Sequence, residues 1–426
     1  MNQSMEALRT FLDGAHSFYH STANLCRQLD DAGYTRLNES ADWSLTPGGK
    51  YYINRGGSSV LAFRIPQGSP AGFMISATHV DHPTFRVKVN GDLTGTYTRV
   101  ATEKYGGLII SPWLDRPLSI AGQAMVETEN GLETRLVDID RDLALIPNVA
   151  IHMNRSINEQ ANWNLAIDTI PLLGGANGEG KLQALLEEAA GGKILGADLY
   201  LYVRQRSSVW GLDNEFISAP GLDNLLCVWA CAQGFLKSGD SAAIPVLAVF
   251  DSEETGSNSR QGADSTMLST VLARISRCLN MDHDRLLASS MLVSADMAHA
   301  LHPNHPEYAD PANAPVMNGG IVLKFNASKN YVTTGLSAAL FRKICSKADV
   351  PLQTFHNRAD IKGGSTLGYI SMNHVSVPSV DIGLAQLAMH SSYETAGAKD
   401  PFYLETAMAE FYGSSLETDG ETYILN

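Results

Sequence analysis

The sequence has few cysteines, few basic residues and no long apolar run, and each shortage excludes a class of protein. Five cysteines are scattered over 426 residues without C-x-x-C spacing, which argues against a disulfide framework and a thiolate zinc site. Lysine and arginine number 31 against 45 acidic residues, a formal net charge of −14, which disfavours nucleic acid and anionic membrane as partners. No apolar run reaches the ~18 residues of a membrane span, and residues 1–20 lack a secretory-signal pattern. We therefore expect a cytoplasmic protein.

Helix-like and strand-like patterns alternate before residue 89 and after residue 217. The stretch "AGFMISATHV" (71–80) is nearly continuous in small and apolar residues, which is typical of a buried strand. Residues 21–34 predict a helix that Ser21 and Thr22 cap and that ends before Gly33. Hydrophobic residues make up 44% of the chain, enough to pack two domains or one large domain with an insertion. The alternation predicts an α/β fold with a largely buried sheet.

The middle of the chain has a different pattern. "SIAGQAMVETENGLETRLVDI" (119–139) alternates with period two around an "ENG" turn, which predicts a β-hairpin. "ADLYLYVRQRSSVW" (197–210) alternates in the same way. We therefore expect a β-rich domain at 89–217, inserted between the two segments, 1–88 and 218–426, of one α/β domain.

Acidic residues and histidines follow several of the expected strands. In "VLAVFDSEETGSNSRQG" (246–262) two adjacent glutamates come directly after a buried strand, at the sheet edge where ligands bind in α/β folds. Clustered acids repel one another unless a positive charge lies among them, and a metal ion is the simplest such charge. The candidates at comparable positions are His79, Asp81, Asp223, Glu253, Glu254, Asp296 and His390.

The residue types among these candidates indicate the metal. Imidazoles and carboxylates without cysteine suit Zn²⁺, with Mn²⁺ or Co²⁺ as alternatives. Two histidines and three acids exceed the needs of one catalytic zinc, whereas two ions ~3.5–4 Å apart, bridged by a carboxylate, use them all. One of the adjacent glutamates then binds metal, and its neighbour is the general base for the attacking water. The pattern also fits simpler interpretations, with Asp223 as a helix N-cap and His79 as a hydrogen-bonded core histidine.

The stretches that contain these residues closely resemble, in order, the motifs of the aspartyl aminopeptidase family. They are "SATHVDHPTFRVK", "YGGLIISPWLDRPLSIAG", "IPNVAIHMNR", "GLDNLLCVWA", "DSEETGSNSRQGADS", "VSADMAHALHPN" and "GLAQLAMHSSYETAG", and the resemblance runs from about residue 10 to 412. It implies a dinuclear metallo-aminopeptidase whose zinc-peptidase-like α/β catalytic domain has a mixed central sheet flanked by helices. It also implies that a β-rich dimerisation domain interrupts this domain and that dimers assemble into tetrahedral dodecamers.

The resemblance also implies roles for single residues. The metal ligands would be His79, Asp223, Glu254, Asp296 and His390, with Asp223 as the bridge between the two metals. Glu253 would be the general base, and Asp81 would orient the imidazole of His79. His152 would reach the active site of a neighbouring subunit and help to stabilise the tetrahedral intermediate. Lys324 would pair with an acidic side chain on the first residue of a peptide substrate.

The chain departs from the family pattern in three stretches, and in the first it has "HVDHPT" (79–84) where H-T-D-S-P-C is usual. Thr84 and His82 alter the stretch beside the first histidine, and His82 is an extra potential ligand or base. Tyr393 and Asn330 stand where arginine is usual, which removes two positive charges from the matched region. The acidic substrate preference is therefore the part of the resemblance that these departures affect.

Other motifs and functions compete with this interpretation. "HALHPNHPEY" offers His299, His302 and His305 as a second metal site, although loop groups around Asp296 are the favoured reading. Ser365 and Thr366 lack a G-x-S-x-G context and predict a structural or substrate-contacting turn. The sequence favours a metallo-aminopeptidase that removes N-terminal residues from peptides, with acidic residues as the expected preference. The alternatives are a two-metal amidohydrolase, such as a deacylase or dipeptidase, and a catalytically silent assembly that binds peptides.

Overall fold

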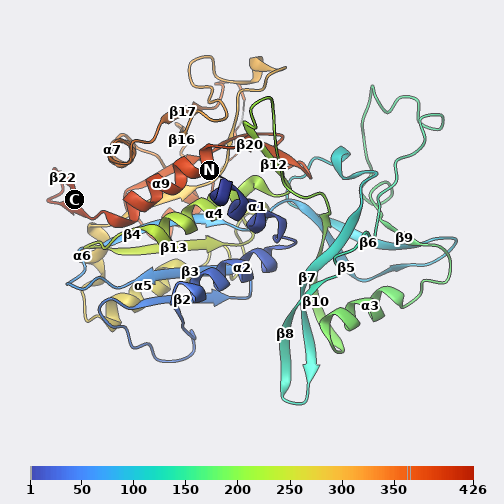
Figure 1. Cartoon of the computed structure of the whole chain (residues 1–426), viewed down its shortest axis with the longest axis horizontal. Helices are drawn as coiled ribbons and strands as arrows, with labels where there is room; N and C mark the ends of the chain where they lie inside the picture. The colour runs from blue at the N-terminus through green and yellow to red at the C-terminus, as the bar shows by residue number, and fades with distance from the viewer. Residues whose placement is uncertain (1, 362, 365) are drawn as a thin grey trace.

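The computed structural model describes residues 2–361, 363–364 and 366–426. Ser365 lies outside these residues, so its interpretation stays a prediction. Within the described part the chain folds into a central sheet with helices on both faces and a second, lateral sheet beside it (Figure 1).

The described residues form a nine-stranded central sheet. Its order is β1 (Thr35–Arg36), β2 (Lys50–Arg55), β3 (Ser59–Arg64), β13 (Ile244–Phe250), β4 (Phe73–His79), β14 (Met291–Ala295), β18 (Ser379–Gly383), β16 (Ile321–Phe325) and β17 (Leu352–His356). Strands β13, β4, β14 and β18 run parallel to one another, whereas β3 and β16 run antiparallel to their neighbours β13 and β18. The predicted α/β fold with a mixed central sheet is confirmed.

Helices bury both faces of this sheet. One face packs against α1 (Asn2–Asp13), α2 (Phe18–Asp31), α4 (Leu222–Lys237), α7 (Gly335–Lys347) and α9 (Asp400–Gly413). The other face packs against α5 (Met267–Cys278), α6 (His283–Ala288) and α8 (Leu367–Met372). Successive residues of β4 point into the two cores in turn, Met74 into the first and Ile75 into the second. This double burial explains why β4 is an uninterrupted run of small and apolar residues.

The second sheet, here called the lateral sheet, is antiparallel and lies to the right of the central sheet in Figure 1. Its strands, in order, are β8 (Gly131–Asp138), β7 (Leu118–Thr128), β10 (Ile194–Val203), β5 (Thr84–Leu93), β6 (Thr98–Tyr105) and β9 (Leu172–Gly174). Helix α3 (Lys181–Ala190) packs on it. The predicted hairpin is present, since β7 and β8 are joined at 129–130. The division at 88/89 and 217/218 and the role in dimerisation stay predictions.

A third, smaller sheet connects two segments that carry candidate site residues. Its order is β11 (Ser208–Trp210), β12 (Phe216–Ala219), β20 (Glu394–Gly397), β19 (Ala385–Leu387) and β15 (Ala298–His299). Asp296 precedes β15 and His390 follows β19, so this sheet holds the two segments together. The remaining elements are the β21 (Leu416–Thr418) and β22 (Tyr423–Leu425) pair and short 3₁₀ helices η1 (Ser111–Trp113), η2 (Glu253–Thr255) and η3 (Pro306–Tyr308).

The start of α2 differs from the prediction. The helix begins at Phe18, and the Oγ atom of Ser17 accepts a hydrogen bond from the backbone N–H of His20, so Ser17 is the cap. Ser21 and Thr22, the predicted caps, are buried within the helix. The predicted end is confirmed, because α2 stops at Asp31 and Gly33 adopts a left-handed φ of 80°.

Candidate active site

The candidate residues converge at the carboxyl ends of the parallel strands. His79 is the last residue of β4, Asp296 follows β14, and the Glu253–Glu254 turn follows β13. Asp223 lies at the start of α4, and His390 lies in the loop between β19 and β20. This arrangement is the expected one for a ligand site in an open α/β sheet.

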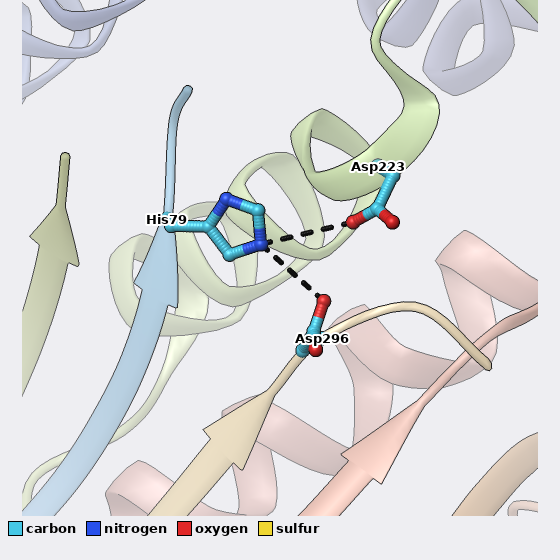
Figure 2. Close-up of side chains that lie close together, drawn as sticks. All are labelled: His79, Asp223 and Asp296. Atoms are coloured by element: carbon cyan, nitrogen blue, oxygen red, sulfur yellow. Dashed lines mark hydrogen bonds and ion pairs between the residues drawn. The ribbon is translucent and has the colours of Figure 1, made fainter. Parts of the chain in front are cut away.

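Two groups of potential metal ligands share Asp223. In the first, the Nε2 atom of His79 lies 3.3 Å from Oδ1 of Asp296 and 3.7 Å from Oδ1 of Asp223 (Figure 2). In the second, Nε2 of His390 lies 3.6 Å from Oδ2 of Asp223 and 3.3 Å from Oε1 of Glu254. The two oxygens of one carboxylate therefore face different histidines.

Asp223 does not cap α4. Asp223 and Asn224 have non-helical backbones that divide the element, and among the described residues the Asp223 side chain accepts no hydrogen bond from a backbone N–H of the helix. Its side chain is buried, and Oδ1 has no hydrogen-bond partner in the described structure. A buried carboxylate oxygen without a donor is costly, and a cation beside it removes that cost. The N-cap interpretation is therefore wrong, and the unpartnered oxygen fits a metal ligand.

The charges in the cluster also fit a bound cation. Burial and the neighbouring carboxylates of Asp296 and Glu254 raise the pKa of Asp223 well above its usual range. Burial also raises the pKa of Glu254, although a hydrogen bond with His390 opposes this. Burial disfavours a charged His79, but the facing carboxylates outweigh it and raise the pKa of that imidazole well above its usual value. Several neighbouring acids are difficult to ionise together, and a divalent cation among them would stabilise their charged forms.

The carboxylate of Asp81 contacts the backbone of both Glu253 and Glu254. Its Oδ1 and Oδ2 atoms accept hydrogen bonds from the backbone N–H groups of Glu253 and Glu254, both at 3.1 Å. The Nδ1 atom of His79 lies 3.0 Å from the backbone oxygen of Asp81 and 3.5 Å from its Oδ1. Asp81 thus contacts the imidazole that it is predicted to orient, and its carboxylate also holds the Glu253–Glu254 turn. The sequence did not indicate this second contact.

Glu253 and Lys324 line one cavity of about 240 Å³ together with the five candidate ligands. Burial raises the pKa of Glu253 to about 8. Lys324 is buried, and its Nζ atom lies 3.4 Å from Oδ2 of Asp296. Burial acts against the charge of Lys324, but the facing Asp296 outweighs it and raises the pKa of the ammonium group. The cavity therefore contains both a candidate base and a cation.

His152 lies apart from these residues. It is exposed, in the segment of turns between β8 and β9 that extends away from the central sheet in Figure 1. Among the described residues, those that line the cavity do not include it. Its predicted action in a neighbouring subunit is compatible with this position and stays a prediction.

Sequence reasoning missed Glu394, the first residue of β20. Its Oε2 atom accepts a hydrogen bond from the backbone N–H of Asp223 at 2.9 Å, and Oε1 accepts one from the backbone N–H of His390 at 2.6 Å. Burial raises the pKa of Glu394 to about 8. A glutamate four residues after His390 in a stretch of small residues was the available signal, because such a residue is seldom buried without a partner.

Three of the residues that depart from the family pattern, Thr84, Tyr393 and His82, make contacts with residues outside the cluster. Thr84 donates a hydrogen bond to the backbone oxygen of Leu201 at 2.6 Å, and Tyr393 donates one to Arg206 at 2.8 Å. The ring of His82 packs edge-on against Phe18, with centroids 5.2 Å apart. Within the described residues, no group with metal-ligand spacing includes His82, His299, His302 or His305. Asn330 accepts a hydrogen bond through its backbone oxygen from Thr366, at 3.4 Å.

Within the described chain, no helix is both long and apolar enough to span a membrane. The cytoplasmic location stays a prediction.

Known proteins resemble the chain over nearly its whole length. The family description "Aminopeptidase I zinc metalloprotease (M18)" matches residues 11–412. A "Probable M18 family aminopeptidase 2" from Clostridium novyi is 41% identical over 421 residues, which cover 95% of this chain and 97% of the relative.

Solved structures share the fold over nearly the whole chain. A chain of the cryo-EM structure of the Ape4 and Nbr1 complex superposes with a TM-score of 0.92 at 35% identity, covering 96% of this chain and 85% of that chain. A chain of the structure described as the S. cerevisiae mApe1 dodecamer superposes with a TM-score of 0.84 at 25% identity, covering 96% of this chain and 96% of that chain. The chain therefore belongs to the M18 family of aminopeptidase I zinc metalloproteases and is a hydrolase of that family.

Proposed function

We propose that the chain is a two-metal aminopeptidase that removes N-terminal residues from peptides, with a preference for acidic residues. The observation that carries this proposal is the shared position of Asp223, whose Oδ1 faces His79 and whose Oδ2 faces His390. A carboxylate in this position suits a bridge between two ions. His79 and Asp296 would complete the ligands of one ion, and Glu254 and His390 those of the other.

The donor types support zinc, which is also the metal in the family description. Mn²⁺ and Co²⁺ suit the same imidazole and carboxylate donors. When bound, such ions act as Lewis acids that polarise the scissile carbonyl and make water a stronger acid.

Glu253 is the proposed general base. It borders the cavity, and its backbone is fixed by the hydrogen bond to Asp81. Burial raises its pKa, the direction that suits a group that takes up a proton and releases it again. We assign to its carboxylate the proton of the attacking water and the transfer of that proton to the leaving amine.

Lys324 is the proposed partner of an acidic first residue. It lines the same cavity as Glu253, and among the described residues its ion pair is with Asp296. If Asp296 binds metal, the ammonium group is available to a substrate carboxylate. The preference for Asp or Glu therefore depends on Lys324 and not on the arginines that Asn330 and Tyr393 replace.

Assembly into a homo-oligomer, with dimers as the building block and a dodecamer as the complete form, belongs to the same proposal. The mApe1 relative is described as a dodecamer. Large apolar side chains flank His152 in this chain, with Val149 52%, Ile151 48% and Met153 84% exposed. Exposed apolar residues on one segment favour contact with another copy. A second copy would then receive His152 beside its own cavity, where an imidazole can stabilise the oxyanion.

The test is hydrolysis of a panel of peptides with free and N-acetylated first residues, together with N-acyl amino acids. The protein is assayed as purified, after chelation, and after return of Zn²⁺, Mn²⁺ or Co²⁺. We expect metal-dependent release of the first residue from free peptides only. Cleavage of N-acyl amino acids instead would indicate an amidohydrolase, and no turnover with metal bound would indicate a silent peptide-binding assembly.

The general base is tested with Glu253→Gln in the same assay. The variant is expected to keep its metal content and to lose about 10²–10⁴-fold in kcat, because an amide cannot accept the proton. Unchanged kcat in a metal-loaded variant would remove Glu253 from the mechanism.

A further inference from the structure

A short segment of the chain leaves the lateral sheet and passes beside the candidate metal site. It comprises residues 105–109, "YGGLI", which begin at the last residue of β6. The segment belongs to one of the motifs that carry the family resemblance, and the function proposed above gives it no role.

Three backbone contacts join this segment to metal-ligand candidates. The carbonyl oxygen of Gly107 accepts a hydrogen bond from Nδ1 of His390 at 2.9 Å, which turns Nε2 toward Asp223 and Glu254. The backbone N–H of Ile109 donates to the carbonyl of His390, also at 2.9 Å. Gly106 has a φ of 72°, and a Cβ atom there would lie 3.0 Å from Cβ of Glu254. A glycine is therefore needed for this close approach.

The side chain of Tyr105 makes the fourth contact. Its hydroxyl donates a hydrogen bond of 2.8 Å to Oδ2 of Asp81. The same carboxylate accepts the backbone N–H groups of both Glu253 and Glu254. Tyr105 is thus one hydrogen bond away from the group that fixes the turn carrying the proposed base and one proposed ligand.

The ring of Tyr105 is held on two sides. Its centroid lies 5.1 Å from that of Phe18 on α2 and 5.5 Å from that of Tyr200 on β10. Such packing leaves the ring few orientations, so the hydroxyl is directed at Asp81 before any substrate arrives.

We propose that Tyr105 is a positioning residue for the reaction, which places the Glu253–Glu254 turn through the carboxylate of Asp81. The inference rests on the proposed function, because it assigns to Tyr105 the geometry of the base and of one ligand. It also gives the lateral sheet a part in catalysis within its own subunit, separate from any part in assembly.

The test compares Tyr105→Phe with Tyr52→Phe, a matched control. Tyr52 on β2 is buried, and its hydroxyl donates a hydrogen bond of the same length, 2.8 Å, to Oδ1 of Asp30, outside the metal cluster. Each variant loses one hydroxyl and one bond to an aspartate. The measurements are kcat, KM, zinc affinity by competition with a chelator, and thermal unfolding temperature.

For Tyr105→Phe we expect kcat or zinc affinity to fall about 10–100-fold, the usual effect of removing a group that orients metal ligands, with KM within about twofold of wild type. For Tyr52→Phe we expect a similar change of unfolding temperature and no change in kcat. Equal kcat and zinc affinity in wild type and Tyr105→Phe would overturn the inference, as would a rise in KM alone.

The proposed function and the role of Tyr105 can be contradicted by different results. A wild-type protein without metal-dependent peptide hydrolysis would contradict the proposed function. An active wild type with an equally active Tyr105→Phe would leave the function intact and remove Tyr105 from it.

Discussion

At the scale of single residues, the site is defined by carboxylates in places where a charge is unfavourable. Asp223 is buried with one oxygen that no described donor contacts, and Glu253 lines the same cavity with its pKa raised to about 8. Burying ionised groups without partners costs several kcal/mol each. Acids buried in such places are typical of a functional site, and the proposed metal ions and proton transfer would need them.

The role of Lys324 in specificity is tested with Lys324→Met, which keeps the length of the side chain and removes its charge. The ratio of kcat/KM for substrates beginning with Asp or Glu to that for substrates beginning with Ala or Leu should fall about tenfold or more, because a charge-assisted hydrogen bond is lost. The substrate panel measures this ratio directly. An unchanged ratio would place the acidic preference elsewhere or exclude it.

At the scale of elements, β20 holds two of the candidate metal ligands in place through hydrogen bonds to their backbone. Glu394 at its first position accepts backbone N–H groups from Asp223 and His390, which come from α4 and from the β19–β20 loop. One side chain therefore sets the distance between two candidate ligands that lie far apart in the sequence.

Glu394→Gln is expected to weaken zinc binding about 10–100-fold, because an amide can accept only one of the two N–H groups. Glu405→Gln is the matched control, since Glu405 on α9 is also buried but forms an ion pair with Lys237 on α4. Chelator competition measures the affinities. Similar zinc affinity in both variants would show that the contact with Glu394 is not needed.

Helix α2 carries a pH-dependent contribution to stability. Burial lowers the pKa of His20 to about 4, below its usual value near 6.5, so the folded state holds the imidazole neutral. Between pH 6.5 and 4 the unfolded chain binds more protons, so the free energy of unfolding falls as the pH falls. Urea unfolding at pH 7 and pH 5 should differ by up to about 2 kcal/mol from this group.

His20→Gln removes that titrating group and should reduce the difference between the two pH values. A difference of unchanged size in the variant would assign the pH dependence to other residues.

Some of these elements and contacts can be predicted from the sequence, whereas others depend on residues that lie far apart in the chain. The run of apolar residues in β4 predicts a buried strand and hence His79 at its carboxyl end, since both faces of the sheet must be covered. The cap of α2 at Ser17 could not be distinguished from Ser21, because serines at both positions offer the same side-chain oxygen. The sequence did not indicate the contact of Glu394 with Asp223 or that of Tyr105 with Asp81, because these pairs lie 171 and 24 residues apart in the chain.

At the scale of the whole molecule, exposed apolar side chains lie on a segment that connects two strands of the lateral sheet. The inner strands of the central sheet are buried between helices, whereas the segment between β8 and β9 exposes Val149, Ile151 and Met153 beside His152. In the proposed oligomer, this exposed apolar segment beside the predicted catalytic histidine would connect assembly to activity.

Two variants separate these effects. Ile151→Glu with Met153→Glu should give a smaller particle by light scattering and low activity, because charge replaces the apolar contact. His152→Gln should keep the size of the wild-type particle and lose kcat. A fully active monomer would contradict the part that a second copy has in the proposed site.

The most direct test of the account is a titration of the metal-free protein with Zn²⁺, with bound metal and peptide hydrolysis followed together. If Asp223 bridges two ions, hydrolysis should reach its plateau at two equivalents of zinc per chain, and Asp223→Asn should bind less zinc and remain inactive. Full activity at one equivalent, or two bound ions without hydrolysis of any peptide in the panel, would contradict the two-metal aminopeptidase.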